Sequence, residues 1–212
     1  DITADGDARC KYVNQAKLTV HGSLVVDREI VNSRIWCGGK VRAAKMLGGE
    51  CLALGGIEAG ILGSDMGVNT VLEPGADFQV RKIDVQLDAI SEKLEALLRP
   101  VEPFLNDRAR YNTLPAERKA EFHKAYDGFQ KLKDAYGKLL QERAERVAAT
   151  AQDAQKQVIV RQLVHPDVFV RTDLCMRQFK KQLKGPLALI EDVDMSTIRP
   201  ARYVPGEGIQ EP

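Results

Sequence analysis

Residues 6–75 carry a pattern of alternating hydrophobic and polar positions that starts again after every 16 or 17 residues. Glycines mark the rounds, at Gly6, Gly22, Gly39 and Gly55. Small or hydrophobic residues stand two and four positions after each glycine, with mostly polar residues between them. Such alternation is typical of β-strands, and glycine permits the tight corner that follows each strand pair. The two hydrophobic columns contain Ala8, Leu24, Val41 and Ile57, and Cys10, Val26, Ala43 and Ala59.

This round is too short for a strand, a helix and a returning strand, which together need roughly 30 residues. It predicts instead a parallel β-solenoid over residues 1–77. Each turn of such a solenoid stacks on the last at about 4.8 Å, so that like residues form columns. Leu24, Val41 and Ile57 should therefore lie directly above one another in the core.

The period changes after Phe78 to the three- and four-residue spacing of helices with one hydrophobic stripe. Pro100 and Pro103 predict that the first helix kinks or ends near Arg99. A loop at 106–115 precedes the second helix, so residues 78–156 are predicted to form a long antiparallel coiled-coil hairpin. The two stripes are Ile83, Leu87, Ile90, Leu94, Leu97, Val101 and Phe104, and Phe122, Ala125, Phe129, Leu132, Tyr136 and Leu139.

Strand-like alternation resumes at Val158. We expect residues 157–198 to return to the solenoid as short strands and to cap its open end, because an uncapped end invites association through its strand edges. Residues 199–212 contain several prolines and glycines and are expected to form a loosely ordered tail.

Charge and composition restrict the classes of function. The 31 basic and 30 acidic residues give a net charge of +1, so no strongly basic field points to a nucleic acid partner. No hydrophobic run reaches the roughly 18 residues that a membrane span needs, and no signal-like segment follows Asp1. The sequence therefore predicts a cytoplasmic protein without a membrane span.

No arrangement of residues points to catalysis, a metal or a cofactor. Four unevenly spaced cysteines without a CxxC pair do not predict a zinc site. Cys10, Cys37 and Cys51 fall on inward columns and are expected to fill the core, whereas Cys175 could be exposed. The tripeptide His-Pro-Asp at 165–167 also marks J-domain co-chaperones, but here it stands between strand-like segments, which favours a β-corner.

Two surfaces are candidates for contact with a protein partner. Trp36, the only tryptophan, should point outward because its neighbours in the strand point inward, and an exposed aromatic ring is an interaction signal. At the tip of the hairpin, Arg108, Arg110 and Tyr111 form a combination suited to protein contacts. Trp36 could instead contact the helices or a neighbouring turn, and the tip could be a solvated turn.

The stretch GGECLALGGIEAGILGSDMGVNTVLEPGADF (48–78) combines paired glycines with a Thr-x-x-x-x-Gly segment just before the helices. VHPDVFV (164–170) and LKGP (183–186) follow the helices. In these segments, and in their order, the chain resembles the bacterial flagellar assembly protein A family. The resemblance covers roughly Gly6 to Ile198, and its motifs are structural glycines and valines.

The resemblance implies a right-handed, single-stranded parallel β-helix that carries a coiled-coil arm. It also implies a non-enzymatic role in bacterial flagellar assembly or polar placement, with protein partners at the cell pole or flagellar base and recruitment of a cytoplasmic protein to that pole. It supplies no catalytic, cofactor-binding or metal-binding residue. The family's separate amino-terminal domain has no counterpart here, as expected for a fragment of a longer protein.

Two other classes of function stay open beside a scaffold that binds protein partners. Bactofilins and the β-helical domain of the division inhibitor MinC share the short turn and would suggest a self-assembling, cytoskeletal homo-oligomer, but they lack an inserted coiled coil. Solenoid acyltransferases and polysaccharide lyases are enzymes of this general architecture. They need a cluster of catalytic side chains, and residues 6–75 hold a single histidine, His21. We therefore expect a scaffold and not an enzyme.

Overall fold

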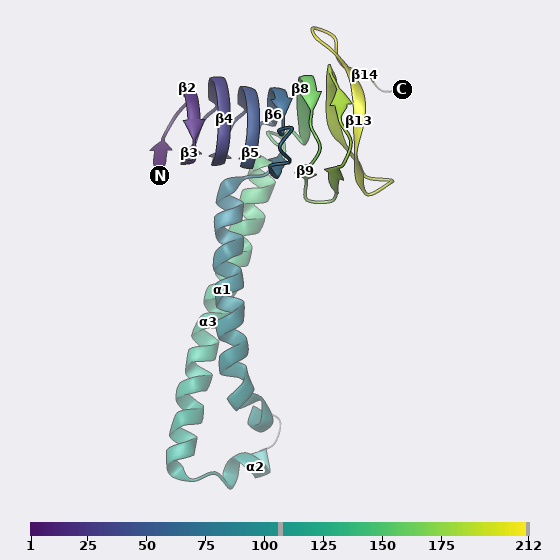
Figure 1. Cartoon of the computed structure of the whole chain (residues 1–212). Helices are drawn as coiled ribbons and strands as arrows, with labels where there is room; N and C mark the ends of the chain where they lie inside the picture. Colours follow the sequence, from purple (N-terminus) through teal and green to yellow (C-terminus); the bar gives the residue numbers. More distant parts are fainter. Residues whose placement is uncertain (106–107, 211–212) are drawn as a thin grey trace. The chain divides into compact units, whose positions relative to one another are not determined.

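The computed structural model describes residues 1–105 and 108–210, except for the side chains of Pro100, Leu105, Arg108 and Arg110. The chain divides into two compact units (Figure 1). The solenoid unit contains Asp1–Phe78 and Thr150–Pro212, and the helical unit contains Gln79–Ala149.

The solenoid unit is built from two ladders of parallel strands, one on each side of the core. Ladder A joins β2, the first parts of β4 and β5, then β6 and β8. Ladder B joins β1, β3, the second parts of β4 and β5, then β7 and β9. The strands are β1 (Ile2–Ala4), β2 (Ala8–Asn14), β3 (Lys17–Val20), β4 (Leu24–Cys37), β5 (Val41–Ala53), β6 (Ile57–Leu62), β7 (Thr70–Pro74), β8 (Gln157–Val164) and β9 (Val168–Arg171).

The register of ladder A confirms the predicted β-solenoid. Leu24 pairs with Val41, Val41 with Ile57, and Ile57 with Val158 across the helical insertion. All four side chains are at most 1% exposed, so the column forms a continuous strip of core. β8 therefore continues the stack in the register that β6 sets, although the helices separate the two strands in sequence.

The repeated glycines lie where the backbones of successive turns approach most closely. A Cβ at Gly39 would lie 2.9 Å from the carbonyl carbon of Gly22, and one at Gly55 would lie 2.8 Å from that of Gly39. The amide of Gly55 donates to the carbonyl of Gly39 at 3.0 Å, and that of Gly39 donates to Gly22 at 2.9 Å. Glycine recurs at this corner because a side chain would push the stacked turns apart.

The opposite corner, where ladder A passes into ladder B, uses a different device. Gln15, Asn32, Gly48 and Asp167 each adopt a positive φ, between 44° and 79°. Polar side chains that tolerate this conformation, together with glycine, turn the chain here. The residues lie at the same corner in different turns, and this corner borders the candidate site described below.

Buried hydroxyl groups complete the hydrogen bonding of this corner. Ser33 is 3% exposed, and its Oγ accepts a hydrogen bond from the amide of Ala16 at 3.2 Å and donates to the carbonyl of Val31 at 2.7 Å. In a later turn, Thr70 Oγ1 accepts from the amide of Gly48 at 2.9 Å. The hydroxyls thus act as hydrogen-bond acceptors for the amides of Ala16 and Gly48 at the bends of the chain.

Antiparallel strands close the end of the solenoid that follows the helices. β10 (Met176–Phe179) pairs with β9, and both β11 (Leu183–Lys184) and β12 (Leu187–Asp192) pair with β8. β13 (Thr197–Val204) then pairs with β12, and β14 (Gly208–Gln210) pairs with β13. Both parallel ladders therefore have a partner at this edge.

The expectation of a loosely ordered tail over 199–212 is wrong for residues up to 210. Six residues of β13 pair with β12, and Ile198 and Ala201 are buried, which offsets the cost of ordering a proline-containing segment. β14 pairs only with residues 202–204, so Pro200 sits on an open stretch of the strand edge, where a missing amide is tolerated. Glu211 and Pro212 lie outside the described residues.

The helical unit contains α1 (Phe78–Leu105), α2 (Arg108–Asn112) and α3 (Ala116–Thr150). The hydrophobic stripe predicted for the first helix has Ile83, Leu87 and Val101 buried, and the stripe predicted for the second is half-buried throughout. α1 does not end at Arg99, and α2 occupies part of the predicted loop. None of the helices among the described residues is long and apolar enough to cross a membrane.

The helices are inserted at a corner of the solenoid, between β7 and β8. The two ends of the insertion are adjacent, since a Cβ at Gly75 would lie 3.3 Å from Lys156 Cα. The amides of Gly75 and Gln155 both donate at 2.8 Å to the preceding turn, to Ala53 and Leu54 respectively. The hydrogen-bonded corner is thus kept although a long segment leaves and re-enters there.

Two ion pairs fasten the turn before the insertion to the turn after it. Glu58 on β6 pairs with Arg161 on β8, and Glu73 on β7 pairs with Arg171 on β9. The Glu58 side chain is 4% exposed and also contacts Lys40 Nζ at 2.7 Å and Arg42 Nε at 3.2 Å. Burial favours its protonated form, but the hydrogen bonds and charges of Lys40 and Arg161 outweigh burial and lower the pKa of Glu58 to about 2.

Replacing Glu58 with glutamine should destabilise the solenoid by about 2–4 kcal/mol at pH 7, because three cations lose their shared carboxylate. The ordinary pKa of this group is 4.5, so its stabilising effect is complete above about pH 4.5 and is lost as the pH falls towards 2. The difference in stability between the wild type and Glu58→Gln should therefore shrink below pH 4.5. Urea unfolding followed by the fluorescence of Trp36 measures it.

Glu50→Gln is the matched control, because among the described residues Glu50 pairs only with the half-exposed Arg34, at 3.0 Å. An ion pair this accessible to solvent is expected to contribute about 0–1 kcal/mol. A stability difference between Glu58→Gln and the wild type that stays constant from pH 7 to pH 3 would contradict the assigned role of the Glu58 carboxylate.

Ser33→Ala should lower the free energy of unfolding by about 1–2 kcal/mol, because it leaves the half-buried amide of Ala16 without its acceptor. Ser64→Ala is the control, since Ser64 Oγ is buried and has no hydrogen-bond partner within the described residues. Its removal should change the free energy of unfolding by less than about 0.5 kcal/mol. Thermal and urea unfolding of both variants measure these changes. Equal losses of unfolding free energy in Ser33→Ala and Ser64→Ala would show that the Ser33 hydroxyl is dispensable.

Candidate functional site

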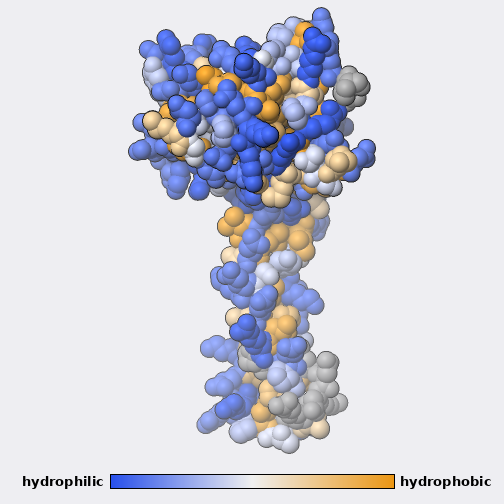
Figure 2. Space-filling view, turned by 45° about the vertical axis from the view of Figure 1, so that its right-hand side comes forward, coloured by the Kyte–Doolittle hydropathy of each residue, from blue (hydrophilic) through white to orange (hydrophobic). Residues whose placement is uncertain are grey.

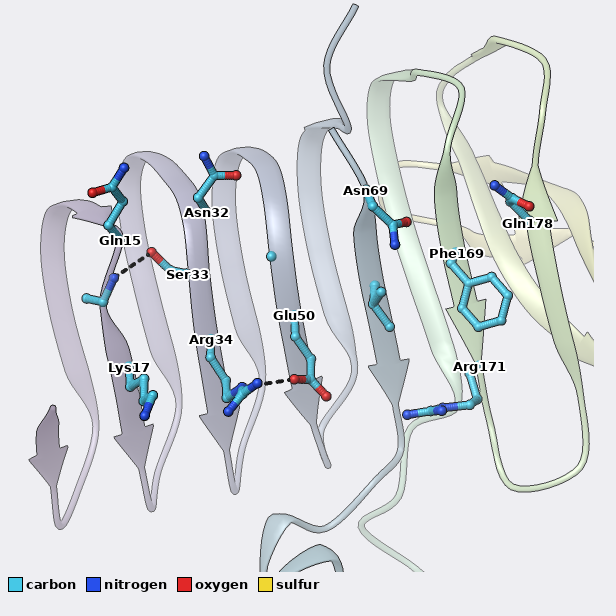
Figure 3. A pocket seen from close by; sticks show the side chains of 13 residues that line it. Gln15, Lys17, Asn32, Ser33, Arg34, Glu50, Asn69, Phe169, Arg171 and Gln178 are labelled. Carbon is cyan, nitrogen blue, oxygen red and sulfur yellow. Dashed lines mark hydrogen bonds and ion pairs between the residues drawn. The ribbon is translucent and has the colours of Figure 1, made fainter. Parts of the chain in front are cut away.

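An open groove of about 880 Å³ runs along the solenoid unit, beside the corner where ladder A passes into ladder B (Figure 3). It is lined by corner residues of several turns and by the first outward-facing position of the ladder B strands. Because each turn contributes similar positions, the groove extends along the stacking direction. Its chemistry can be read as three groups: amides, charged side chains and apolar side chains.

A row of amide side chains borders the groove along the corner. Gln15, Asn32 and Asn69 occupy this row in different turns and are exposed. Within the described residues their side-chain amides have no hydrogen-bond partner. Gln178, on the antiparallel strand β10, also lines the groove and donates to Asp167 Oδ1 at 3.2 Å. The first three amides are therefore available to donate to and accept from a bound molecule.

Charged residues occupy the end of the groove nearer the N-terminus. Lys17, Arg34 and Glu50 stand in register in three successive turns of ladder B. Arg34 Nε contacts Glu50 Oε2 at 3.0 Å (Figure 3). Lys17 is exposed and forms no ion pair within the described part of the chain. Arg171, which pairs with Glu73, adds a further cation at the other end.

The same outward column becomes apolar in the later turns. Val71 follows Glu50 in the register of ladder B, and Phe169 follows Val71. Both side chains are half-buried and line the groove. The column therefore changes from charged to apolar along its length, which gives the groove a direction.

The lining of the groove offers hydrogen-bonding, charged and apolar side chains. Among its lining residues in the described structure, Ser33 carries the one hydroxyl group, and this group is buried and committed to two backbone partners. No group of three or more His, Cys, Asp or Glu side chains that could hold a metal ion occurs among the described residues.

Trp36 lies in the outward column of ladder B, between Thr19 and Leu52 of the neighbouring turns. It is half-buried, and its indole Nε1 is buried without a hydrogen-bond partner among the described residues. The outward placement agrees with the sequence pattern. A role of Trp36 in binding stays a prediction.

Tyr111 packs within the helical unit. Its hydroxyl lies 2.8 Å from His123 Nε2, and its ring lies 5.2 Å from that of Phe122. Lys119 Nζ stands 5.5 Å from the centre of the Tyr111 ring. The residue thus joins α2 to α3. The side chains of Arg108 and Arg110, predicted beside it as contact residues, lie outside the described residues.

The cysteines take core positions. Cys37 and Cys51 are buried, and burial raises the pKa of Cys37 to about 11 and that of Cys51 well above 9.0. Cys10 is partly buried against the core. The expectation that Cys175 could be exposed is wrong: it is 3% exposed, because the turn between β9 and β10 folds back and places its Sγ 3.5 Å from the carbonyl of Asp192.

The His-Pro-Asp tripeptide forms the corner between β8 and β9, as the strand context predicted. The amide of His165 donates to Leu62 of the previous turn at 2.8 Å, and that of Asp167 donates to Phe179 at 2.9 Å. His21 stacks edge-on against Phe78 at 5.3 Å. The hydrogen bonds and the ring contact of these residues stabilise corners of the solenoid.

The groove itself was not predicted from the sequence. Its signal was present in the spacing of polar residues, since Lys17, Arg34 and Glu50 recur with the same step as the glycines, and Gln15 and Asn32 precede two of them by two positions. Polar residues between inward columns are ordinarily solvated. Only the stacked structure shows that these border a continuous depression.

The surface of the solenoid unit is mixed in character. Figure 2 shows mainly hydrophilic side chains on the face in view, with hydrophobic side chains between them, and a similar mixture along the helical unit. The exposed large hydrophobic residues of the solenoid unit lie mainly in turns and at strand ends: Ile2, Tyr12, Met66, Val68, Leu174, Met176, Val193 and Met195.

The comparisons with known proteins agree with the fold. Residues 1–195 match the family model described as the Flagellar Assembly Protein A beta solenoid domain. Searches among curated proteins and among solved structures found no match. The match covers most of the 212 residues, and the structure shows the β-solenoid that the family description names. The chain therefore belongs to the Flagellar Assembly Protein A β-solenoid domain family.

Proposed function

We propose that this chain is a non-enzymatic scaffold that binds protein partners during flagellar assembly. Family membership supports a role in flagellar assembly. The observation that carries the scaffold role is the groove of about 880 Å³, held by several turns of a hydrogen-bonded ladder and lined by side chains suited to recognition. The Ser33 hydroxyl that borders it is committed to backbone partners, which favours binding over covalent catalysis.

The helical unit is the second contact surface in this proposal. We take α1 and α3 to form an antiparallel coiled coil, because opposite ends of the two helices meet. Arg143 Nε donates to Asp84 Oδ1 at 2.6 Å, and the ring of Phe104 lies 6.0 Å from that of Phe122. α3 has no fully buried residue. The unit thus keeps apolar side chains exposed for a partner, namely Val85, Leu140 and Val147.

The finer parts of the proposal come from the family resemblance and the sequence pattern. They are a right-handed winding of the solenoid, a cytoplasmic location and recruitment to the cell pole or flagellar base. Trp36, Arg108, Arg110 and Tyr111 are proposed contact residues. Of these, Tyr111 also holds α2 to α3 through His123, so its substitution would alter the packing of the helices as well as a contact.

Replacing residues 79–149, the helical unit, with a glycine–serine linker tests the proposal. This range leaves in place Phe78, which stacks against His21, and Gln155, whose amide donates to Leu54, so the solenoid unit keeps its own contacts. Trp36 fluorescence and the β-sheet circular dichroism signal should be retained, whereas a crosslinking pull-down from a flagellated bacterium should lose most of the flagellar components captured by the intact chain.

The control carries the same linker in the exposed turn between β13 and β14 and keeps the helices. It should capture the same components as the unmodified chain. Equal capture by all three forms would show that the helical unit is not a contact surface, and capture of no flagellar component by the intact chain would overturn the scaffold function.

Self-assembly into a cytoskeletal polymer is the second candidate, favoured by the strands at the start of the solenoid. Within the described residues β1 pairs only with β3, and β2 pairs only with β4, so each has one unpaired edge. Unpaired edges template association with another chain. Ile2 and Tyr12 are exposed on these strands, at 61% and 54%.

Sedimentation velocity over a wide concentration range, with electron microscopy, tests this candidate. Self-assembly predicts species that grow with concentration, and Tyr12→Lys at the edge should suppress them. Small discrete species at every concentration would exclude the polymer.

A further inference from the structure

The groove carries more positive charge than the chain as a whole. Three cations, Lys17, Arg34 and Arg171, line it with one anion, Glu50, whereas the whole chain has a net charge of only +1. At the end nearer the N-terminus, Lys17 and Arg34 outnumber Glu50, and Lys17 forms no ion pair within the described residues. This end of the groove therefore favours an anionic group.

The other end of the same column favours an apolar group. Val71 and Phe169 follow Glu50, and Phe169 lies four ladder steps from Lys17 (Figure 3). At about 4.8 Å per step, the distance is roughly 19 Å. An extended polypeptide advances about 3.3 Å per residue, so residues that reach the two ends stand about six positions apart.

The occupant must be held by side chains of the groove, not as an added strand. The strands beneath it pair on both sides, since β4 lies between β3 and β5, and β7 lies between β5 and β9. No strand edge is open to β-augmentation there. The free amides of Gln15, Asn32 and Asn69 can instead donate to and accept from the peptide groups of an extended chain.

We propose that the groove binds an extended acidic segment of about seven residues from a partner protein. Its carboxylate lies against Lys17 and Arg34, and an aromatic or large aliphatic side chain lies against Val71 and Phe169. A neutral glycan would leave the ammonium group of Lys17 without a counter-charge. The inference rests on the proposed scaffold function and names the chemistry of the segment that the scaffold recognises.

Selection from a display library of random eight-residue peptides on the full-length chain tests this inference. Enriched peptides should carry Asp or Glu near one end and an aromatic or large aliphatic residue about six positions away, because an even separation keeps both side chains on one face of an extended chain. A fluorescently labelled copy of the most enriched peptide should bind Lys17→Glu at least about tenfold more weakly than the wild type, and Phe169→Ala should also weaken binding.

Lys45→Glu is the matched control, because Lys45 is an exposed lysine on ladder A that does not line the groove. It should bind the peptide as the wild type does. Trp36 fluorescence checks that each variant is folded. Enriched peptides without this acidic and apolar pattern, or equal binding by Lys17→Glu and the wild type, would overturn the inference. So would saturable binding of chitohexaose that Phe169→Ala weakens and that the peptide does not displace.

This test and the helix-replacement test fail independently. Peptide binding that depends on Lys17, with no flagellar component captured by the intact chain, would overturn the flagellar scaffold function while keeping the chemistry of the groove. Capture of flagellar components that Lys17→Glu leaves unchanged, with no acidic peptide selected, would overturn the groove inference alone.

Discussion

Stacking of parallel turns is the constraint on which the rest of the solenoid unit depends. Each backbone pairs with the turn before and the turn after it, and the inward columns, such as Leu24, Val41, Ile57 and Val158, are buried between the ladders. No single turn could bury its apolar face alone, so stability comes from neighbours. The spacing of the turns then fixes where glycine is required, as at Gly39 and Gly55, and where a buried hydroxyl must replace a backbone partner, as at Ser33.

The same constraint explains how the chain accepts a long helical insertion. The insertion leaves after Gly75 and returns before Lys156, at a corner where the two residues are adjacent. β8 and β9 then pair with β6 and β7 in register. The buried carboxylates of Glu58 and Glu73 each form an ion pair with an arginine of the returning strands. A buried charge left without its partner is costly, so these pairs penalise a slipped register as well as stabilising the correct one.

The groove is a consequence of repetition. A position that faces outward in one turn faces outward in the next, so isolated polar residues become rows, and one column can change from charged to apolar along its length. A rigid, hydrogen-bonded base presents these rows at fixed intervals, which reduces the ordering cost of binding an extended partner. In the scaffold that we propose, the groove and the helical unit are two contact surfaces of different character.

The sequence by itself determined the inward columns, the solenoid turn and the helical stripes. Buried positions recur with a fixed period in these elements, so hydrophobic residues recur in the sequence with the same period. It did not show that Phe169 continues the column of Val71, that Arg161 meets Glu58, or that the segment after Ile198 forms strands. Nor did it show that α1 continues past Pro100, where the burial of Val101 and the contact of Phe104 with Phe122 favour the helix. Only the tertiary structure decided these points, because outward residues carry no periodic burial signal and their neighbours depend on the register in which a distant strand returns.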